Sequence, residues 1–107
     1  MGKNGKKQRS MALYEAILSL KTIEECHSFF DDLCTANELR SMEQRYDVAV
    51  YLLQGKVYLD ILELTGASSA TISRVRRNIL ENNEGGMLQQ AVLRQGLAER
   101  KEEGALL

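Results

Sequence analysis

The chain has 107 residues and a formal net charge of −1, with 14 lysines and arginines against 15 aspartates and glutamates. This length favours one domain with a modest core. Because the charges nearly balance, the overall charge alone does not indicate a class of binding partner. The chain has no proline and no tryptophan, and is rich in residues that lose little side-chain freedom in helices. The composition therefore predicts an all-α protein of about six helices.

The residue types that build catalytic and metal sites are scarce. His27 is the one histidine, and Cys26 and Cys34 are eight residues apart. In a helix, eight residues span roughly 12 Å, which is beyond disulfide reach, and the spacing matches no zinc motif. We predict no enzyme activity, no metal and no cofactor, and interpret the cysteines as small buried apolar residues. No segment has the length and apolar character of a membrane span or a signal peptide, so a soluble cytoplasmic protein is expected.

The first half of the chain predicts a basic tail and three helices. Residues 1–9 are polar and basic, which predicts a disordered arm, and residues 10–107 are expected to form a single helical domain. Ser10 is a suitable N-cap for the first helix. The segments TIEE and TANE, which begin at Thr22 and Thr35, match capping boxes that open a second and a longer third helix.

The second half predicts three shorter helices. Gly55 is suited to end the third helix in a left-handed conformation. Residues 57–64 predict a short helix, Gly66 interrupts it, and a fifth helix is expected over residues 69–81 with Ser68 as its N-cap. The segment NNEGG then predicts a turn, and a sixth helix is expected from residue 87 before a charged tail.

The two helices around Gly66 match a helix-turn-helix. Ile61 lies five residues before the glycine, and Ile72 and Val75 lie six and nine residues after it. The pair Ile72 and Val75 can therefore pack the second helix against the first. Small or hydroxylated residues at the start of a recognition helix allow entry into the major groove, and arginines further on bind guanine edges or phosphates. We therefore predict binding of double-stranded DNA by Ser68, Ser69, Ala70, Ser73, Arg74, Arg76 and Arg77, with Lys56 on the flanking backbone.

Two features leave an alternative open. Arginines near a helix C-terminus also suit the helix dipole of an ordinary helical hairpin. Leu62, four residues before the glycine, is large where closely crossing helices usually place a small residue. The alternative function is a helical protein-interaction module that docks an acidic partner of the transcription machinery.

The segment LRSMEQRYDVAVYLLQGKVYLDILELTGASSATISRVRRNIL resembles the Trp repressor superfamily, and is most similar to its YerC/YecD-like branch. The resemblance implies an intertwined all-helical homodimer, with residues 10–55 in dimerisation, 57–81 in the helix-turn-helix reading head, and 87–107 in a C-terminal helix and tail. It also implies a sequence-specific transcriptional regulator, with repression as the expected mode.

The resemblance further implies the positions of an effector pocket, made of Thr35, Arg45, Arg74 and Asn78. Arg45 and Arg74 match the two arginines that sandwich tryptophan in the repressor, and Thr35 matches a threonine that binds its polar groups. However, Val75 replaces the glycine that leaves room for the indole, and Asn78 replaces a serine. We therefore expect no dependence on tryptophan, and a different small-molecule effector stays open.

Overall fold

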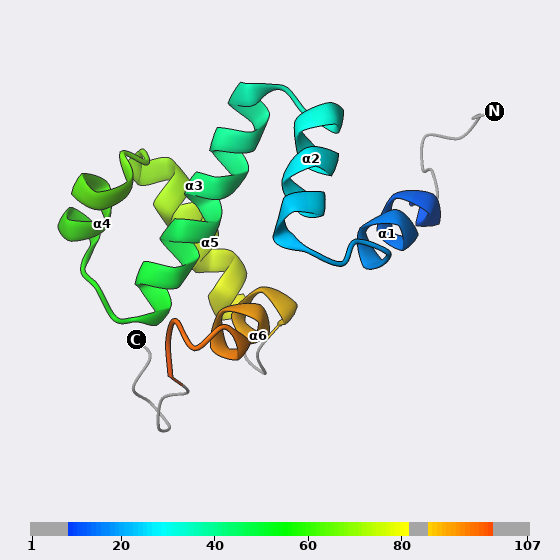
Figure 1. The fold of residues 1–107 in the computed structure, drawn as a ribbon. Helices are drawn as coiled ribbons and strands as arrows, with labels where there is room; N and C mark the ends of the chain where they lie inside the picture. Colours follow the sequence, from blue (N-terminus) through cyan, green and yellow to red (C-terminus); the bar gives the residue numbers. More distant parts are fainter. Residues whose placement is uncertain (1–8, 82–85, 100–107) are drawn as a thin grey trace. The chain divides into compact units, whose positions relative to one another are not determined.

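The computed structural model describes residues 9–81 and 86–99, which form six α-helices and no strand (Figure 1). The all-α prediction is confirmed, whereas the arm up to residue 8 and the tail from residue 100 lie outside the described residues. The chain divides into two compact units, residues 1–39 and 40–107. The helices are α1 (Met11–Leu18), α2 (Ile23–Leu33), α3 (Ala36–Leu53), α4 (Tyr58–Thr65), α5 (Ser69–Glu81) and α6 (Met87–Arg94).

The three predicted N-cap residues of the first unit each precede a helix, and two of them cap it with a side-chain hydrogen bond. Thr35 and Glu38 form a complete capping box, in which each side chain accepts the backbone N–H of the other residue at 3.1 and 2.8 Å. Thr22 Oγ1 likewise accepts the N–H of Glu25, but the Glu25 carboxylate accepts the N–H of Lys21 rather than that of Thr22. Ser10 occupies the N-cap position of α1 as predicted, although its side chain forms no cap hydrogen bond.

The first unit contains no core of its own. Neither α1 nor α2 has a buried residue, although both carry apolar side chains. Leu18 and Ile23 are 85% and 77% exposed. Cys26 is also exposed, which corrects the interpretation of both cysteines as buried residues, and Cys34 is half-buried. Both cysteines are free thiols. Amphipathic helices of this length are marginal in water without a surface to cover their apolar side.

The second unit holds the core. Its helices α3, α4, α5 and α6 lie together in Figure 1, and α3 contributes the largest number of buried side chains. Residues three, four and seven apart share one face of a helix, which explains why the apolar positions of α5 point the same way. The buried core residues are Val48, Ala49, Val50, Leu53, Ile61, Ala67, Ile72, Val75, Ile79, Val92 and Ala98.

Gly55 ends α3 as predicted, with a positive φ of 88°. Its N–H donates to the carbonyl of Leu52, and the N–H of Lys56 donates to the carbonyl of Tyr51, both at 3.0 Å. This pair of bonds is a Schellman motif, which satisfies helix-end carbonyls and favours glycine because a Cβ is strained at positive φ. Over the described residues, no helix is long and apolar enough to cross a membrane.

Candidate nucleic-acid interface

The turn between α4 and α5 is fixed by backbone geometry and by side chains. Gly66 has φ 72° and ψ 8°, the left-handed conformation that the sequence predicts for it. The hydroxyl of Thr65 donates to the carbonyl of Ile61 at 2.7 Å and accepts the N–H of Ala67 at 3.0 Å. From α3, the amide Nε2 of Gln44 donates to the carbonyl of Thr65 at 3.0 Å. The direction in which the chain enters α5 is therefore determined by several hydrogen bonds.

The start of α5 is capped and accessible. The hydroxyl of Ser68 accepts the N–H of Thr71 at 3.1 Å, which confirms its predicted role as N-cap. The same hydroxyl lies 3.1 Å from Thr71 Oγ1 and donates to it. Ser69 and Ala70 are exposed, and neither has a long side chain that would keep the helix backbone away from a ligand. This end of α5 is thus shaped for close approach.

The opposite face of α5 is anchored in the core. Ile72, Val75 and Ile79 are 0%, 4% and 6% exposed, and Ile61 of α4 is fully buried. Ile61, Ile72 and Val75 are the apolar positions that the helix-turn-helix interpretation assigned to the contact between the two helices. Leu62 is half-buried and packs against this core.

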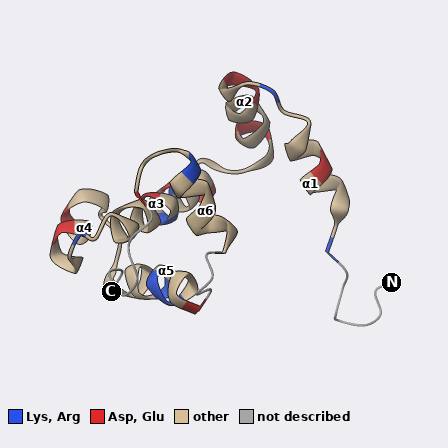
Figure 2. Ribbon diagram, turned by 90° about the horizontal axis from the view of Figure 1, so that it is seen from below, with Lys and Arg blue, Asp and Glu red and all other residues tan. Residues whose placement is uncertain are grey.

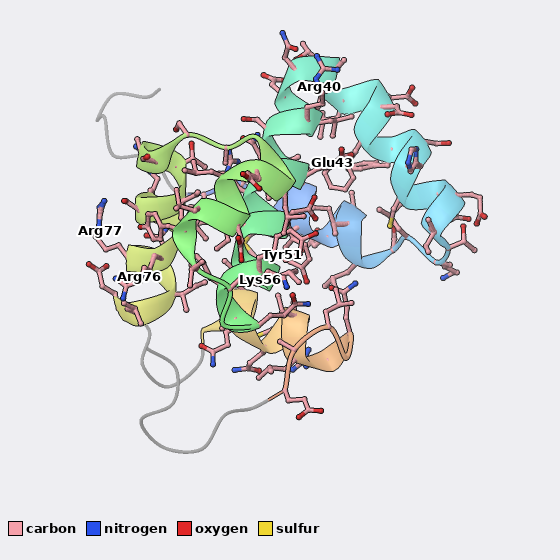
Figure 3. The ribbon with its side chains drawn as sticks, turned by 90° about the vertical axis from the view of Figure 1, so that its left-hand side faces the viewer. Arg40, Glu43, Tyr51, Lys56, Arg76 and Arg77 are labelled. Atoms are coloured by element: carbon pink, nitrogen blue, oxygen red, sulfur yellow. The ribbon has the colours of Figure 1, made fainter. Side chains whose placement is uncertain are left out.

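The three arginines of α5 are exposed, but they point in different directions. Arg74 lines a hollow together with Arg45 of α3. Arg76 lies beside Leu52 and Leu80 of the core edge, and Arg77 is directed away from the other helices (Figure 3). A step of 100° per residue explains why Arg76 and Arg77 differ in direction, since consecutive side chains cannot share one helix face. Of the three, Arg77 has the most open position for a large ligand.

Acidic side chains do not neutralise this surface. Among the described residues, none of the three arginines forms a salt bridge with an aspartate or glutamate. In Figure 2 the basic positions of α5 lie around its middle, and an acidic residue follows only at its end, Glu81. Asp60 and Glu63 lie on the exposed side of α4. The exposed face of α5 therefore has a positive local charge in a chain that is nearly neutral overall.

Ser73 and Lys56 have neighbours that the sequence analysis did not identify. The hydroxyls of Ser73 and Tyr58 lie 3.0 Å apart and share a hydrogen bond between α5 and α4. Lys56 is exposed just after α3, with its Nζ 5.8 Å from the ring centroid of Tyr51 (Figure 3). A cation over an aromatic ring is held only weakly at an exposed site. Tyr58 could not be found from the sequence because its partner is 15 residues away.

The hollow between α3 and α5 contains half of the implied effector pocket. Its volume is about 190 Å³, and Arg45 and Arg74 both line it, together with Ser41, Gln44, Ala70 and Thr71. Asn78 is not among its lining residues, and Thr35 belongs to the first compact unit. Val75 is buried in the core and is not among the residues that line the hollow. The volume itself is below the roughly 300 Å³ at which small-molecule pockets begin.

The titratable groups give no sign of a reactive centre. Burial raises the pKa of the Tyr46 hydroxyl above its usual range, and this hydroxyl donates a hydrogen bond to Gln95 Oε1. Over the described part of the chain, no three His, Cys, Asp or Glu side chains are grouped so that they could hold a metal ion. His27 pairs at 3.6 Å with Asp31 on the exposed surface of α2. The chemistry available at the α5 surface is therefore hydrogen bonding and charge.

Comparisons with known proteins agree with this geometry. The family model described as Trp repressor protein matches residues 8–96. The uncharacterized protein YerC of Bacillus subtilis (strain 168) is 54% identical over 72 residues, which cover 67% of this chain and 69% of that protein. A crystal structure of a TrpR-like protein from Eubacterium eligens is similar with a TM-score of 0.76 and 47% identity, covering 84% of this chain and 91% of the other. A candidate Trp repressor from Staphylococcus aureus gives a TM-score of 0.77 and 42% identity, covering 86% and 93%.

Proposed function

Because this chain belongs to the Trp repressor family, we propose that it is a sequence-specific DNA-binding transcriptional regulator, a repressor that acts as a homodimer without tryptophan. The family consists of regulators rather than enzymes. The observation that carries the proposal is the exposed face of α5, where Ser69, Ala70 and Arg77 are accessible while Ile72 and Val75 anchor the helix in the core.

The roles of the α5 side chains follow from where each one lies. Ser69 and Ala70 permit close approach of the helix start to the floor of the major groove. Arg77 reads a guanine or neutralises a phosphate, and Arg74 and Arg76 bind the phosphates on either side. Ser73 reaches the groove from its position beside Tyr58. Lys56, together with the Ser68 end of α5, contacts the flanking backbone.

The proposal of a homodimer is supported by the unsatisfied apolar surface of the first unit. Five apolar side chains of α1 and α2 are between 38% and 85% exposed, namely Met11, Leu13, Leu18, Ile23 and Leu33. Apolar side chains left exposed in this number are typical of an interface, and large obligate interfaces resemble a domain core cut in half. A second copy of the chain covers it, and the two-fold axis then places two copies of α5 about 34 Å apart on DNA.

Independence from tryptophan is supported by the small hollow beside Arg45 and Arg74. At about 190 Å³ the hollow is smaller than the sites that usually enclose a ligand of this class. Without an effector, Arg74 is available to a phosphate and Arg45 remains on the surface of α3, where its Nη1 lies 3.4 Å from the hydroxyl of Ser41.

The test is selection of bound sequences from random duplexes, followed by affinity measurements over a range of salt concentrations. Arg77→Ala should lower the log–log salt slope by about 0.9 if the side chain contacts one phosphate, or relax one base position if it reads guanine. Arg94→Ala removes the same charge from α6, where Arg94 contacts Gln90, and should leave both quantities unchanged. No enriched sequence, or equal effects of the two variants, contradicts the proposal. Weak DNA binding with little salt dependence would instead favour an acidic protein partner.

A further inference from the structure

A side-chain hydrogen bond links the turn before α5 to α3. Gln44 Nε2 donates to the carbonyl of Thr65 at 3.0 Å, across 21 positions of sequence, and the side chain is half-buried. Thr65 is the last residue of α4, where carbonyls have no partner within the helix. The bond therefore satisfies a helix-end carbonyl and also links the longest helix to the turn.

The geometry of the turn concentrates the effect of this bond on α5. Thr65 also holds Ile61 and Ala67 through its hydroxyl, so its backbone is fixed from both sides. Gly66 between them has no Cβ, and an added Cβ there would meet Gln44 Nε2 only at 4.0 Å, so side-chain packing does not immobilise it. Ala67, the residue after Gly66, is buried in the core, and Gln44 adds a hydrogen bond to the turn that comes from outside α4 and α5.

From these contacts we propose that Gln44 is a positioning residue that sets the angle of α5 and thereby the sequence specificity of the protein. The proposal rests on the proposed DNA-binding function. Arg77 lies roughly 12 Å along the helix from Ser69, at 1.5 Å per residue. A tilt of α5 by about 10° at the turn displaces the position of Arg77 by about 2 Å. Hydrogen bonds to base edges tolerate a displacement of only a few tenths of an ångström. Contacts to phosphates tolerate more, because charge attraction falls slowly with distance.

The chain offers a matched control for this residue. Gln54, also on the α3 side of the unit, donates its Nε2 to the carbonyl of Leu97 at 2.8 Å. Like the bond of Gln44, it runs from a side-chain amide to a backbone carbonyl. It links the end of α3 to the segment after α6 and does not contact the reading head. Gln44→Met and Gln54→Met each remove one amide donor while keeping a long side chain that favours helix.

The experiment measures two quantities at a temperature where circular dichroism shows all three proteins fully folded. The first is the ratio of affinities for the selected duplex and a random duplex. Gln44→Met should lower this ratio about tenfold, as expected for the loss of one base contact, with unchanged affinity for random DNA. The second is amide hydrogen exchange, which should become faster at Gly66 and Ala67. Gln54→Met should change neither.

The outcomes separate this inference from the proposed function. An unchanged ratio for Gln44→Met overturns the inference even if exchange at the turn is faster, and so do equal losses in both variants. If the unmodified protein shows no sequence preference, the proposed function fails. In that case, amide exchange at Gly66 and Ala67 that is unchanged in Gln44→Met also refutes the restraint of the turn by Gln44.

Discussion

Replacing Gly66 by alanine tests whether the turn of the reading head depends on a left-handed backbone. With φ at 72°, a residue with a Cβ is strained by about 1–2 kcal/mol. Alanine also restricts the unfolded chain, which offsets about 0.4–1 kcal/mol of that strain. The added Cβ meets nothing closer than Gln44 Nε2 at 4.0 Å, so no steric term is added. The net loss in the free energy of unfolding should be about 1 kcal/mol.

This loss is measured by urea unfolding at a fixed protein concentration, because assembly makes apparent stability depend on concentration. Gly66→Asn should cost less than Gly66→Ala, since asparagine tolerates the left-handed region. Gly96→Ala is the control: Gly96 has φ 76° with no atom within 4 Å of an added Cβ, but it follows α6 and lies outside the reading head. Both alanine variants should lose similar stability, and only Gly66→Ala should lose DNA specificity. An unchanged or higher stability of Gly66→Ala would refute the reasoning.

Three further outcomes are expected. Ile72→Ala removes a fully buried side chain between α4 and α5 and should cost about 2–5 kcal/mol in urea unfolding, whereas a loss below about 1 kcal/mol would show that α5 is not anchored there. Burial raises the pKa of Tyr46 on folding, so its contribution to the free energy of unfolding is complete below the usual tyrosine pKa of about 10 and is lost as pH rises through the pKa of the folded state. Tyr46→Phe should therefore lose less stability than the unmodified protein at alkaline pH. Identical plots of stability against pH for the two proteins would contradict the shift. Adding tryptophan at millimolar concentration should leave affinity for the selected duplex unchanged, and a clear increase would contradict the proposed independence from tryptophan.

Much of the fold was accessible to sequence reasoning because its signals are local. The bounds of α5 agree with the predicted range, since the cap at Ser68 and the spacing of Ile72 and Val75 are signals that act within two turns of helix. The capping box at Thr35 is equally local. Ser10 has the right position without the expected bond, which shows that a suitable residue type does not settle where a hydroxyl points.

The errors and omissions concern contacts between distant parts of the chain. The bonds of Gln44 to Thr65 and of Tyr58 to Ser73 join positions 21 and 15 residues apart, and depend on how helices cross. Gln44 and Thr71, which line the hollow beside Arg45 and Arg74, were not identified from the sequence for the same reason. Cys26 was expected to be buried because its residue type usually is, yet α2 has no covering partner within its own unit. Pattern alone does not reveal that a helix leaves its apolar side unpaired.

The central claim is that two symmetry-related copies of α5 present their exposed face to one DNA duplex. Hydroxyl-radical footprinting of the selected duplex tests it most directly, together with the protein-to-DNA ratio of the complex. The account predicts two symmetric protected regions about 10 base pairs apart and two chains per duplex. One protected region bound by a single chain, or protection that survives replacement of Arg74, Arg76 and Arg77 by alanine, would contradict it.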